Sequence, residues 1–295
     1  MGKIIQINHT YYMSHWYQPY LAEFGKPIRQ VPAEILSTVQ QKLRNKKDEQ
    51  PIVSVILIAH NEGTHLLSCL WSLVDNHCNL PMEIMVVNNN STDDTEEVLK
   101  ELGVTYYNET QKGPGHARQC GLDHARGKYH LCIDADTLYP PRYIETHVKQ
   151  LMKPGVACTF GLWSFMPDKK NSPLGLWFYE SLRDIHLNIQ AIKRPELCVR
   201  GMNFGFNTEL GRRFGFRTDI IRGEDGSLAL AMKPYGKLVF IRSRKVRVMT
   251  GYGTVGADGS LLNSFYKRFV KALKGATGLF TKKTVYKDED SNLIK

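Results

Sequence analysis

The sequence shows no long apolar run, no leader-like pattern in its first residues and no closely spaced cysteine pair. Its longest apolar stretch, Ile52 to Ala59, is far shorter than the roughly 18 residues that cross a bilayer, so no membrane-spanning helix is expected. The segment from Met1 to Gln6 has no compact apolar region followed by small residues, which disfavours a cleavable signal. Six cysteines are scattered without a C-x-x-C pair. We therefore expect reduced, structural thiols in a cytoplasmic protein, and neither a zinc ribbon nor a disulfide framework.

Acidic residues are scarce in one region only. The 295 residues include 39 Lys or Arg and 29 Asp or Glu, which gives a formal net charge of +10. Residues 236–287 hold twelve Lys or Arg and a single acid, Asp258, so the excess positive charge is local and the remaining chain is nearly neutral. With 42% hydrophobic and 23% charged residues, the chain has the composition of a folded, enzyme-sized protein.

Strands and helices alternate in regular order from residue 52 onward. The pattern predicts strands at 52–58, 83–87, 104–107 and 129–133, separated by helices at about 63–75, 93–103 and 115–125. Ser91 and Thr92 are the expected caps of the middle helix, which should stop at Gly103. Alternation of this kind implies an α/β fold with a mainly parallel sheet that helices cover on both faces.

The flanking regions differ from this regular part. Residues 1–50 are predicted to be an accessory segment, with an aromatic-rich opening and a helix from Pro32 to about Lys46. Residues 51–145 form the regular α/β half, and residues 146–260 form an elaborated second half. Residues 261–295 form a basic amphipathic helix and a tail.

Three polar clusters directly follow predicted strands: residues 60–62, residues 88–91 and residues 134–136. Ligands of open α/β sheets bind outside the carboxyl ends of the strands, so three clusters at one edge indicate a site. Ordinary polar loop caps are the alternative for any single cluster. Extended backbone points Asp134 and Asp136 to the same side, where both carboxylates can address one divalent cation. An exposed acidic turn before Pro140 remains the alternative interpretation.

These residues carry a resemblance to a known family. Its motifs are Val53-Ser54-Val55-Ile56 through Asn61-Glu62, Val86 through Thr95, Ala117-Arg118 with Gly121, Ala125-Arg126-Gly127 and Asp134-Ala135-Asp136, and more faintly Gly201-Met202-Asn203 and Gly223-Glu224-Asp225. Together they resemble a family 2 glycosyltransferase of the GT-A fold, with a Rossmann-like, mainly parallel sheet. The resemblance is strong from about residue 51 to 145 and covers roughly two thirds of the chain.

The resemblance implies an inverting, metal-assisted transfer of a sugar from a nucleotide diphosphate donor to a hydroxyl of a glycan or lipid-linked glycan. Residues 51–145 would bind the nucleotide sugar, and residues 146–260 would bind the acceptor and catalyse transfer. The implied donor-binding residues are Ala59, Asn61, Glu62, Asn88, Asn90, Arg118, Asp134 and Ala135. Asp136 would be the direct ligand of Mn²⁺ or Mg²⁺, and Asp134 would contact the ribose or the hydrated metal.

The acidic pair Glu224-Asp225 matches the family's catalytic pair, so the resemblance makes Asp225 the general base with Glu224 beside it. Without that context, the pair also suits the first turn of a helix running to Met232. Two features depart from many relatives. Asn88 replaces an acidic residue in the nucleoside loop, and no histidine after His186 is available as a further metal ligand.

Several aromatic and histidine residues carry weaker signals. Trp163, Trp177 and Tyr179 are expected to be buried aromatics of the second half or platforms for acceptor sugars. His60 and His65 lack the spacing of a metalloprotease motif, and we expect ordinary surface or core histidines there.

The basic C-terminal segment has helical periodicity. Its apolar face consists of Leu262, Phe265, Tyr266, Phe269, Val270 and Leu273, and its other face carries Lys267, Arg268, Lys271 and Lys274. Residues 261–274 could pack on their own domain or make peripheral contact with the cytoplasmic face of a membrane. Nucleic acid is not expected as a partner, because no reading motif or interleaved stacking aromatics accompany the cations.

Two rival functions remain open from the sequence. A nucleotidyltransferase on a similar sheet would need a glycine-rich, cationic triphosphate loop after the first strand, and none occurs there. A catalytically silent nucleotide- or glycan-binding protein would have no need of both Asp136 and Asp225.

Overall fold

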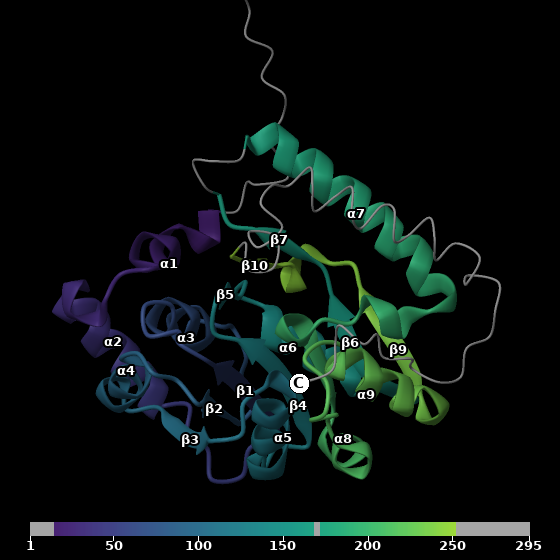
Figure 1. Ribbon diagram of the computed structural model, residues 1–295, viewed down its shortest axis with the longest axis horizontal. Coiled ribbons are helices and arrows are strands. Elements are labelled where there is room, and N and C mark those ends of the chain that lie inside the picture. The colour runs from purple at the N-terminus through teal and green to yellow at the C-terminus, as the bar shows by residue number, and fades with distance from the viewer. Residues whose placement is uncertain (1–14, 168–171, 252–295) are drawn as a thin grey trace, which may run out of the picture.

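The computed structural model describes residues 15–167 and 172–251 (Figure 1). The predicted basic helix at 261–274 lies outside the described residues. A seven-stranded sheet with the order β3-β2-β1-β4-β8-β6-β9 forms the centre of the fold. Its strands are β1 (Val53–Ala59), β2 (Met82–Asn89), β3 (Thr105–Glu109), β4 (Tyr129–Asp134), β6 (Val156–Gly161), β8 (Phe204–Asn207) and β9 (Lys237–Ile241).

Most neighbouring strands of this sheet are parallel. β1 pairs in parallel with β2 and β4, β2 with β3, and β6 with β9, whereas β8 runs antiparallel to both β4 and β6. The predicted α/β fold with a mainly parallel sheet is therefore confirmed. A second sheet has the order β5-β10-β7 and consists of β5 (Thr137–Leu138), β7 (Trp163–Phe165) and β10 (Val248–Thr250).

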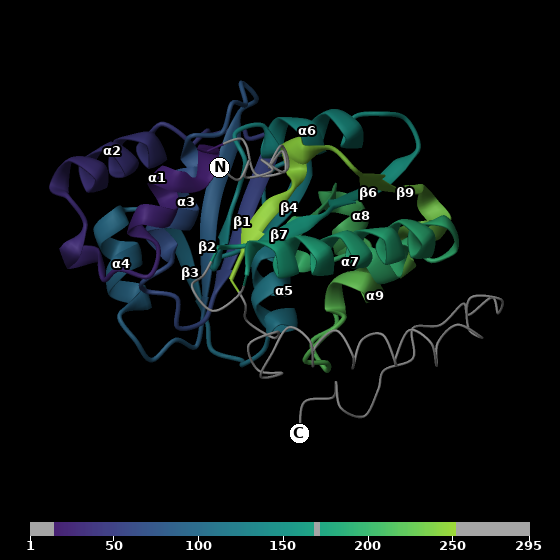
Figure 2. The same ribbon diagram turned by 90° about the horizontal axis from the view of Figure 1, so that it is seen from above.

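Helices cover both faces of the large sheet (Figure 2). The α-helices are α1 (Gln18–Glu23), α2 (Ala33–Arg44), α3 (Leu66–Val74), α4 (Thr95–Leu102), α5 (Pro114–His124), α6 (Tyr143–Leu151), α7 (Pro173–Lys193), α8 (Thr208–Phe214) and α9 (Glu224–Met232). The 3-10 turns are η1 (His15–Tyr17), η2 (Ile28–Gln30), η3 (Pro195–Cys198), η4 (Gly201–Asn203), η5 (Lys233–Tyr235) and η6 (Arg244–Val246). Val55 and Leu57 belong to the large core with α3, whereas Ile56 packs with Ala117 of α5 on the opposite face.

The helix α4 begins differently from the sequence prediction. It ends as expected at Gly103, whose positive φ of 65° favours glycine. The predicted caps were wrong, because Ser91 accepts a hydrogen bond from the backbone N–H of Asn61 (2.9 Å) and not from the helix. Asp93 instead accepts the backbone N–H of Thr95 (3.0 Å). Ser91 therefore ties together two loops that follow neighbouring strands.

The accessory segment is fixed to the sheet layer through Asp75, which follows α3. Tyr20 of α1 donates a hydrogen bond to the Asp75 carboxylate (2.9 Å), and Lys42 of α2 forms an ion pair with it (2.5 Å). The helix predicted from Pro32 to about Lys46 is α2, which covers 33–44. Both N-terminal helices therefore dock on α3, and Tyr20 of α1 also lies in a small apolar cluster with Met166 and Met249 of the second half.

Candidate active site

The three polar clusters meet at one edge of the large sheet, as the strand order requires. In the parallel register, Ala59 at the end of β1 lies opposite Asn88 of β2. On its other side, β1 places Ile58 opposite Asp134 of β4. The loops after these strands therefore emerge next to one another, which is the arrangement that the sequence predicted.

The first two loops are joined by hydrogen bonds. Asn61 has a positive φ of 58°, and its side-chain oxygen accepts the backbone N–H of Thr92 (2.7 Å). The backbone N–H of Glu62 donates to the Thr95 hydroxyl (2.8 Å). These bonds offset the cost of left-handed backbone at a residue other than glycine. Asn61 therefore sets the shape of this edge, which is consistent with its predicted place in the site.

Arg118 of α5 joins residues from both halves of the chain. Its Nη2 donates to a carboxylate oxygen of Asp134 at 2.7 Å. Its Nε lies 3.3 Å from Glu224 Oε1 and 3.0 Å from Asp225 Oδ1. The guanidinium is only 4% exposed. Four predicted site residues, separated by up to 107 positions in the sequence, therefore form one ion-paired cluster.

The cluster holds more negative than positive charge. Burial and the neighbouring Glu224 raise the pKa of Asp225 to about 7, and the Arg118 guanidinium opposes that rise. For Arg118, burial lowers the pKa, but Asp225 and Asp134 outweigh it, so the guanidinium stays charged. Its Nη1 is buried and has no hydrogen-bond partner within the described residues. A further anion that reached Nη1 would satisfy this donor.

Asp136 lies beside this cluster without a basic partner of its own. Its carboxylate accepts the Thr137 hydroxyl (3.0 Å), and no Lys or Arg of residues 15–167 or 172–251 forms an ion pair with it. Burial and the charges of Asp134 and Glu62 raise the pKa of Asp136 to about 7. A divalent cation would supply the missing positive charge, and oxygen ligands suit Mn²⁺ or Mg²⁺.

No group of three or more His, Cys, Asp or Glu side chains in the described part of the chain is arranged to hold a metal ion. Asp134 is already engaged by Arg118. The donor set therefore fits a metal that takes one or two carboxylates from the protein and its other ligands from water or phosphate.

The remaining predicted site residues lie at the same edge in different environments. Ala59 and Ala135 are buried in the core, so only their backbone is available to a ligand. Asn88 is buried too, and its amide N–H donates to the side-chain oxygen of Asn108 (2.8 Å). Asn90 is exposed and has a positive φ of 54°.

Three supporting residues were not assigned roles from the sequence. A Cβ atom at Gly201 would lie 1.8 Å from Nη2 of Arg118, so only glycine leaves room for the guanidinium. The Tyr139 hydroxyl accepts the backbone N–H of Asp134 (3.0 Å) and fixes the end of β4. His65 Nδ1 lies 2.6 Å from a carboxylate oxygen of Glu62, one of the predicted donor-binding residues.

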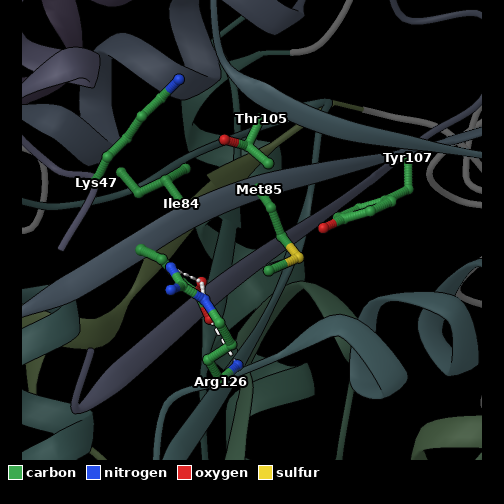
Figure 3. Close-up of a pocket in the computed structure, with 7 residues that line it drawn as sticks. Lys47, Ile84, Met85, Thr105, Tyr107 and Arg126 are labelled. Atoms are coloured by element: carbon green, nitrogen blue, oxygen red, sulfur yellow. Dashed lines mark hydrogen bonds and ion pairs between the residues drawn. The ribbon is translucent and has the colours of Figure 1, made fainter. Parts of the chain in front are cut away.

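A small cavity of about 150 Å³ lies at the other end of β2 and β3 (Figure 3). Its cations already have partners within the fold: Arg126 pairs with Glu83 (2.7 Å), and Lys47 donates to the Gly103 carbonyl (3.0 Å). This cavity is therefore separate from the ion-paired cluster and carries none of the predicted site residues.

Comparison with known proteins agrees with this fold. The sequence profile of glycosyl transferase family 2 matches residues 54–214. The chain therefore belongs to glycosyl transferase family 2, as the motifs implied. It is 29% identical over 245 residues to glycosyltransferase GlyA of Streptococcus pneumoniae, covering 76% of this chain and 33% of GlyA. It is 32% identical over 106 residues to an uncharacterized glycosyltransferase of Rickettsia prowazekii, covering 35% and 33% of the two chains. The chain thus spans about a third of the length of these relatives.

Solved structures of GT-A glycosyltransferases share the fold. Mannosyltransferase PcManGT from Pyrobaculum calidifontis, in complex with GDP-Man and Mn²⁺, superposes with a TM-score of 0.55 at 22% identity, covering 77% of this chain and 67% of that one. S. aureus TarS 1-349 in complex with UDP-GlcNAc superposes with a TM-score of 0.50 at 18% identity, covering 68% and 58%. At these identities the likeness concerns the fold, which is of the GT-A type.

Proposed function

We propose that this chain is an inverting glycosyltransferase that moves a sugar from a nucleotide diphosphate donor to an acceptor hydroxyl. The observation that carries the proposal is the cluster around Arg118. In it, the family's acidic pair meets Asp134 at the carboxyl edge of the sheet. A silent binding protein has no need of two buried carboxylates next to one arginine, because their mutual repulsion costs stability.

Asp225 is the proposed general base. Its raised pKa of about 7 lies close to the pH of most cells, where a carboxylate is both ionised and basic enough to accept a proton. In the proposed step, Asp225 takes the proton of the acceptor hydroxyl while the hydroxyl oxygen attacks the anomeric carbon. The bond to the nucleotide diphosphate breaks on the opposite face. One displacement of this kind inverts the configuration.

The donor's diphosphate is proposed to lie between Arg118 and Asp136. The free Nη1 of Arg118 is available to donate to a phosphate oxygen, and Asp136 with Asp134 would hold Mn²⁺ or Mg²⁺ there. When bound, the metal stabilises the negative charge of the departing nucleotide diphosphate. The joined loops that follow β1 and β2 would enclose the nucleoside, with Asn61 and Asn88 beside it. Mn²⁺ is named in the PcManGT complex and supports a metal of this kind.

The acceptor is proposed to be a glycan or a lipid-linked glycan, reached from the second half of the chain. Residues 261–274 would contribute peripheral contact with a membrane through their basic amphipathic pattern. Within the described residues, no helix is both long enough and apolar enough to cross a bilayer.

A thermal-shift screen of nucleotide sugars, with and without Mn²⁺, tests the donor directly. The proposal expects at least one nucleotide diphosphate sugar to raise the melting temperature, and to do so more strongly with the metal. The stabilising donor is then incubated with glycan and lipid-linked acceptors, and release of nucleotide diphosphate is followed. Binding without hydrolysis or transfer across a wide acceptor set would favour the silent binding protein instead.

A further inference from the structure

The helix α7 presents an exposed apolar face to solvent. It is 21 residues long, and its residues Leu174, Trp177, Phe178, Ile185, Ile189 and Ile192 are all exposed. We call these six residues the α7 apolar face. Ile192 is 78% exposed and Leu174 is 63% exposed. At about 100° per residue, the six positions fall within an arc of about 120°. A continuous apolar face of this size on an otherwise ordinary surface indicates a contact site.

The opposite face of α7 packs on the small sheet. Glu180 accepts the backbone N–H of Phe165 in β7 (2.7 Å) and the Ser164 hydroxyl (2.9 Å). Asp184 pairs with Arg183 (2.8 Å) and with Arg247 beside β10. Both acids of α7 are therefore turned inward and neutralised. The α7 apolar face consequently contains no charged residue.

Basic residues border this uncharged face. Arg242 is exposed and donates to the side-chain oxygen of Asn188 on α7, and Lys193 is exposed at the helix end. Figure 1 shows α7 along the outside of the fold, next to β7 and β10. Apolar side chains flanked by cations, with no exposed carboxylate on the described residues of α7, match a bilayer that contains anionic lipids.

The chain leaves the described structure at the end of the small sheet, on which α7 packs. Thr250, the last residue of β10, accepts the backbone N–H of Met166, which directly follows β7 (2.9 Å). Ten residues separate Gly251 from the basic amphipathic segment at 262–273, and they span at most about 35 Å. That reach exceeds the length of α7, about 31 Å at 1.5 Å per residue. The segment and the α7 apolar face can therefore meet the same surface.

From these observations we propose that the α7 apolar face binds the surface of a bilayer containing anionic lipids, next to residues 262–273. Gly251 also contacts the site, because its backbone N–H donates to the Asp136 carbonyl (3.4 Å). The three-stranded sheet β5-β10-β7 would thus separate a bilayer at α7 from Asp136. The inference extends the proposed membrane contact, but its test needs no catalytic turnover.

Co-sedimentation with vesicles of equal parts phosphatidylcholine and phosphatidylglycerol tests the proposal on the full chain. We expect the wild type to bind, and Ile185→Ser/Ile189→Ser to bind at least tenfold more weakly. Met152→Ser is the matched control, because Met152 is 46% exposed at the end of α6 and should bind as the wild type does. Circular dichroism and melting temperature verify that each variant folds. Equal binding of the α7 variant and the wild type would overturn the proposal and leave residues 262–273 as the sole contact.

Trp177 provides a second, direct measurement. Vesicles containing brominated lipid should quench tryptophan fluorescence in the wild type and quench it much less in Trp177→Phe.

Analytical ultracentrifugation of the wild type and of Ile185→Ser/Ile189→Ser tests whether a second copy of this chain covers the α7 apolar face instead. If the wild type is a dimer and Ile185→Ser/Ile189→Ser is a monomer, the face joins two copies and the membrane proposal is wrong. If vesicles bind but no quenching depends on Trp177, α7 lies outside the contact, which also contradicts the proposal. Loss of sugar transfer with vesicle binding intact would instead count against the proposed function alone.

Discussion

The guanidinium of Arg118 lies 3.0 Å from the carboxylate of Asp225, across 107 positions of sequence. The pair joins α5 of the regular α/β half to the first turn of α9 in the second half. Because the same guanidinium also binds Asp134, the charge at the end of β4 and the charge of the proposed base depend on one cation. A change at any member of this cluster should therefore affect the others.

Asp225→Asn should reduce sugar transfer by about 10² to 10⁴-fold, the usual contribution of a general base. The raised pKa predicts a further signature: because the base works only when ionised, wild-type activity should rise with pH through about 7. This rise at acidic pH, the acid limb of the pH profile, should be absent from the residual activity of Asp225→Asn. Initial rates between pH 5 and 9 measure both effects.

The matched control for this experiment is Glu209→Gln, because the Glu209 side chain is 81% exposed on α8. It should keep the wild-type rate and pH profile. Donor binding by Asp225→Asn, measured by thermal shift, should be close to wild type. Full activity in Asp225→Asn would disprove the assignment of the base.

Gly201→Ala should disturb the cluster without removing any charge. The new Cβ would lie 1.8 Å from Nη2 of Arg118 and 2.3 Å from its Cζ, so the guanidinium must move. We expect a loss of about 1–3 kcal/mol in stability from overpacking. Transfer should also slow, and its acid limb should move to higher pH, because Asp225 loses the cation that holds its pKa down.

Gly175→Ala on α7 is the glycine control, since its Cβ would meet only the Ser172 hydroxyl at 2.9 Å. It should leave both the rate and its pH profile unchanged. If Gly201→Ala loses stability but keeps the wild-type pH profile, Gly201 has only a packing role.

Asp136→Asn should stabilise the metal-free protein at high pH. The folded-state pKa of about 7 lies above the ordinary value of 3.8, so the folded state binds more protons between these values. Stability from this group is therefore lost as pH rises through that window. At pH 8 the free energy of unfolding of the variant, measured by urea titration, should exceed that of the wild type by up to about 4 kcal/mol. At pH 4 the two proteins should unfold at nearly the same urea concentration.

Mn²⁺ should reverse this order at pH 8. It should stabilise the wild type by binding the folded state, and stabilise Asp136→Asn much less. Equal stabilisation of both proteins by Mn²⁺ would place the metal elsewhere. A variant that is less stable than the wild type at pH 8 without metal would contradict the charge argument itself.

The sequence predicted the first half of the fold well, because its central strands β1, β2 and β4 are buried on both faces and its helices have clear boundaries. The apolar run of β1 and the glycine that ends α4 are local signals of this kind. The second half gave no comparable signal. Its strands are short, and β8 inserts antiparallel between β4 and β6, an order that no local pattern encodes.

The candidate site was predictable to the same extent. Residues that follow strands, such as Asn61 and Asp134, were found because the sheet edge gathers them. The role of Gly201 could not be found, because it depends on the path of an arginine side chain from another helix. The same holds for the inward-turned acids of α7. Glu180 and Asp184 look like ordinary surface charges in the sequence, but they leave the exposed face of the helix uncharged.

A buried histidine behind the site provides the last prediction. His147 of α6 lies between the Thr159 hydroxyl (2.8 Å) and the side-chain oxygen of Asn203 (2.9 Å). The Asn203 amide N–H groups already donate to the carbonyls of Leu162 (2.8 Å) and Val246 (2.7 Å). The Asn203 oxygen must therefore accept the Nε2–H of a neutral His147, whose Nδ1 accepts the Thr159 hydroxyl.

Burial lowers the pKa of His147 to about 4, whereas the side-chain hydrogen bond with Asn203 opposes this shift. Between pH 4 and 6.5 the unfolded state thus binds more protons than the folded state, so stability contributed by the neutral ring falls as pH falls. His147→Gln removes this dependence and keeps a group that can donate to Asn203. We expect the variant to be less stable than the wild type at pH 7.5, with the difference shrinking by about 2 kcal/mol at pH 5. Urea unfolding of both proteins at the two pH values measures it. Asp136 and Asp225 change stability with pH in the opposite direction to His147. Both proteins contain these two carboxylates, so their contributions cancel when the wild type and the variant are compared. A difference that stays constant with pH would mean that the pKa of His147 is not lowered in the folded protein, and at pH 5 its Nδ1–H would then donate to the Thr159 hydroxyl.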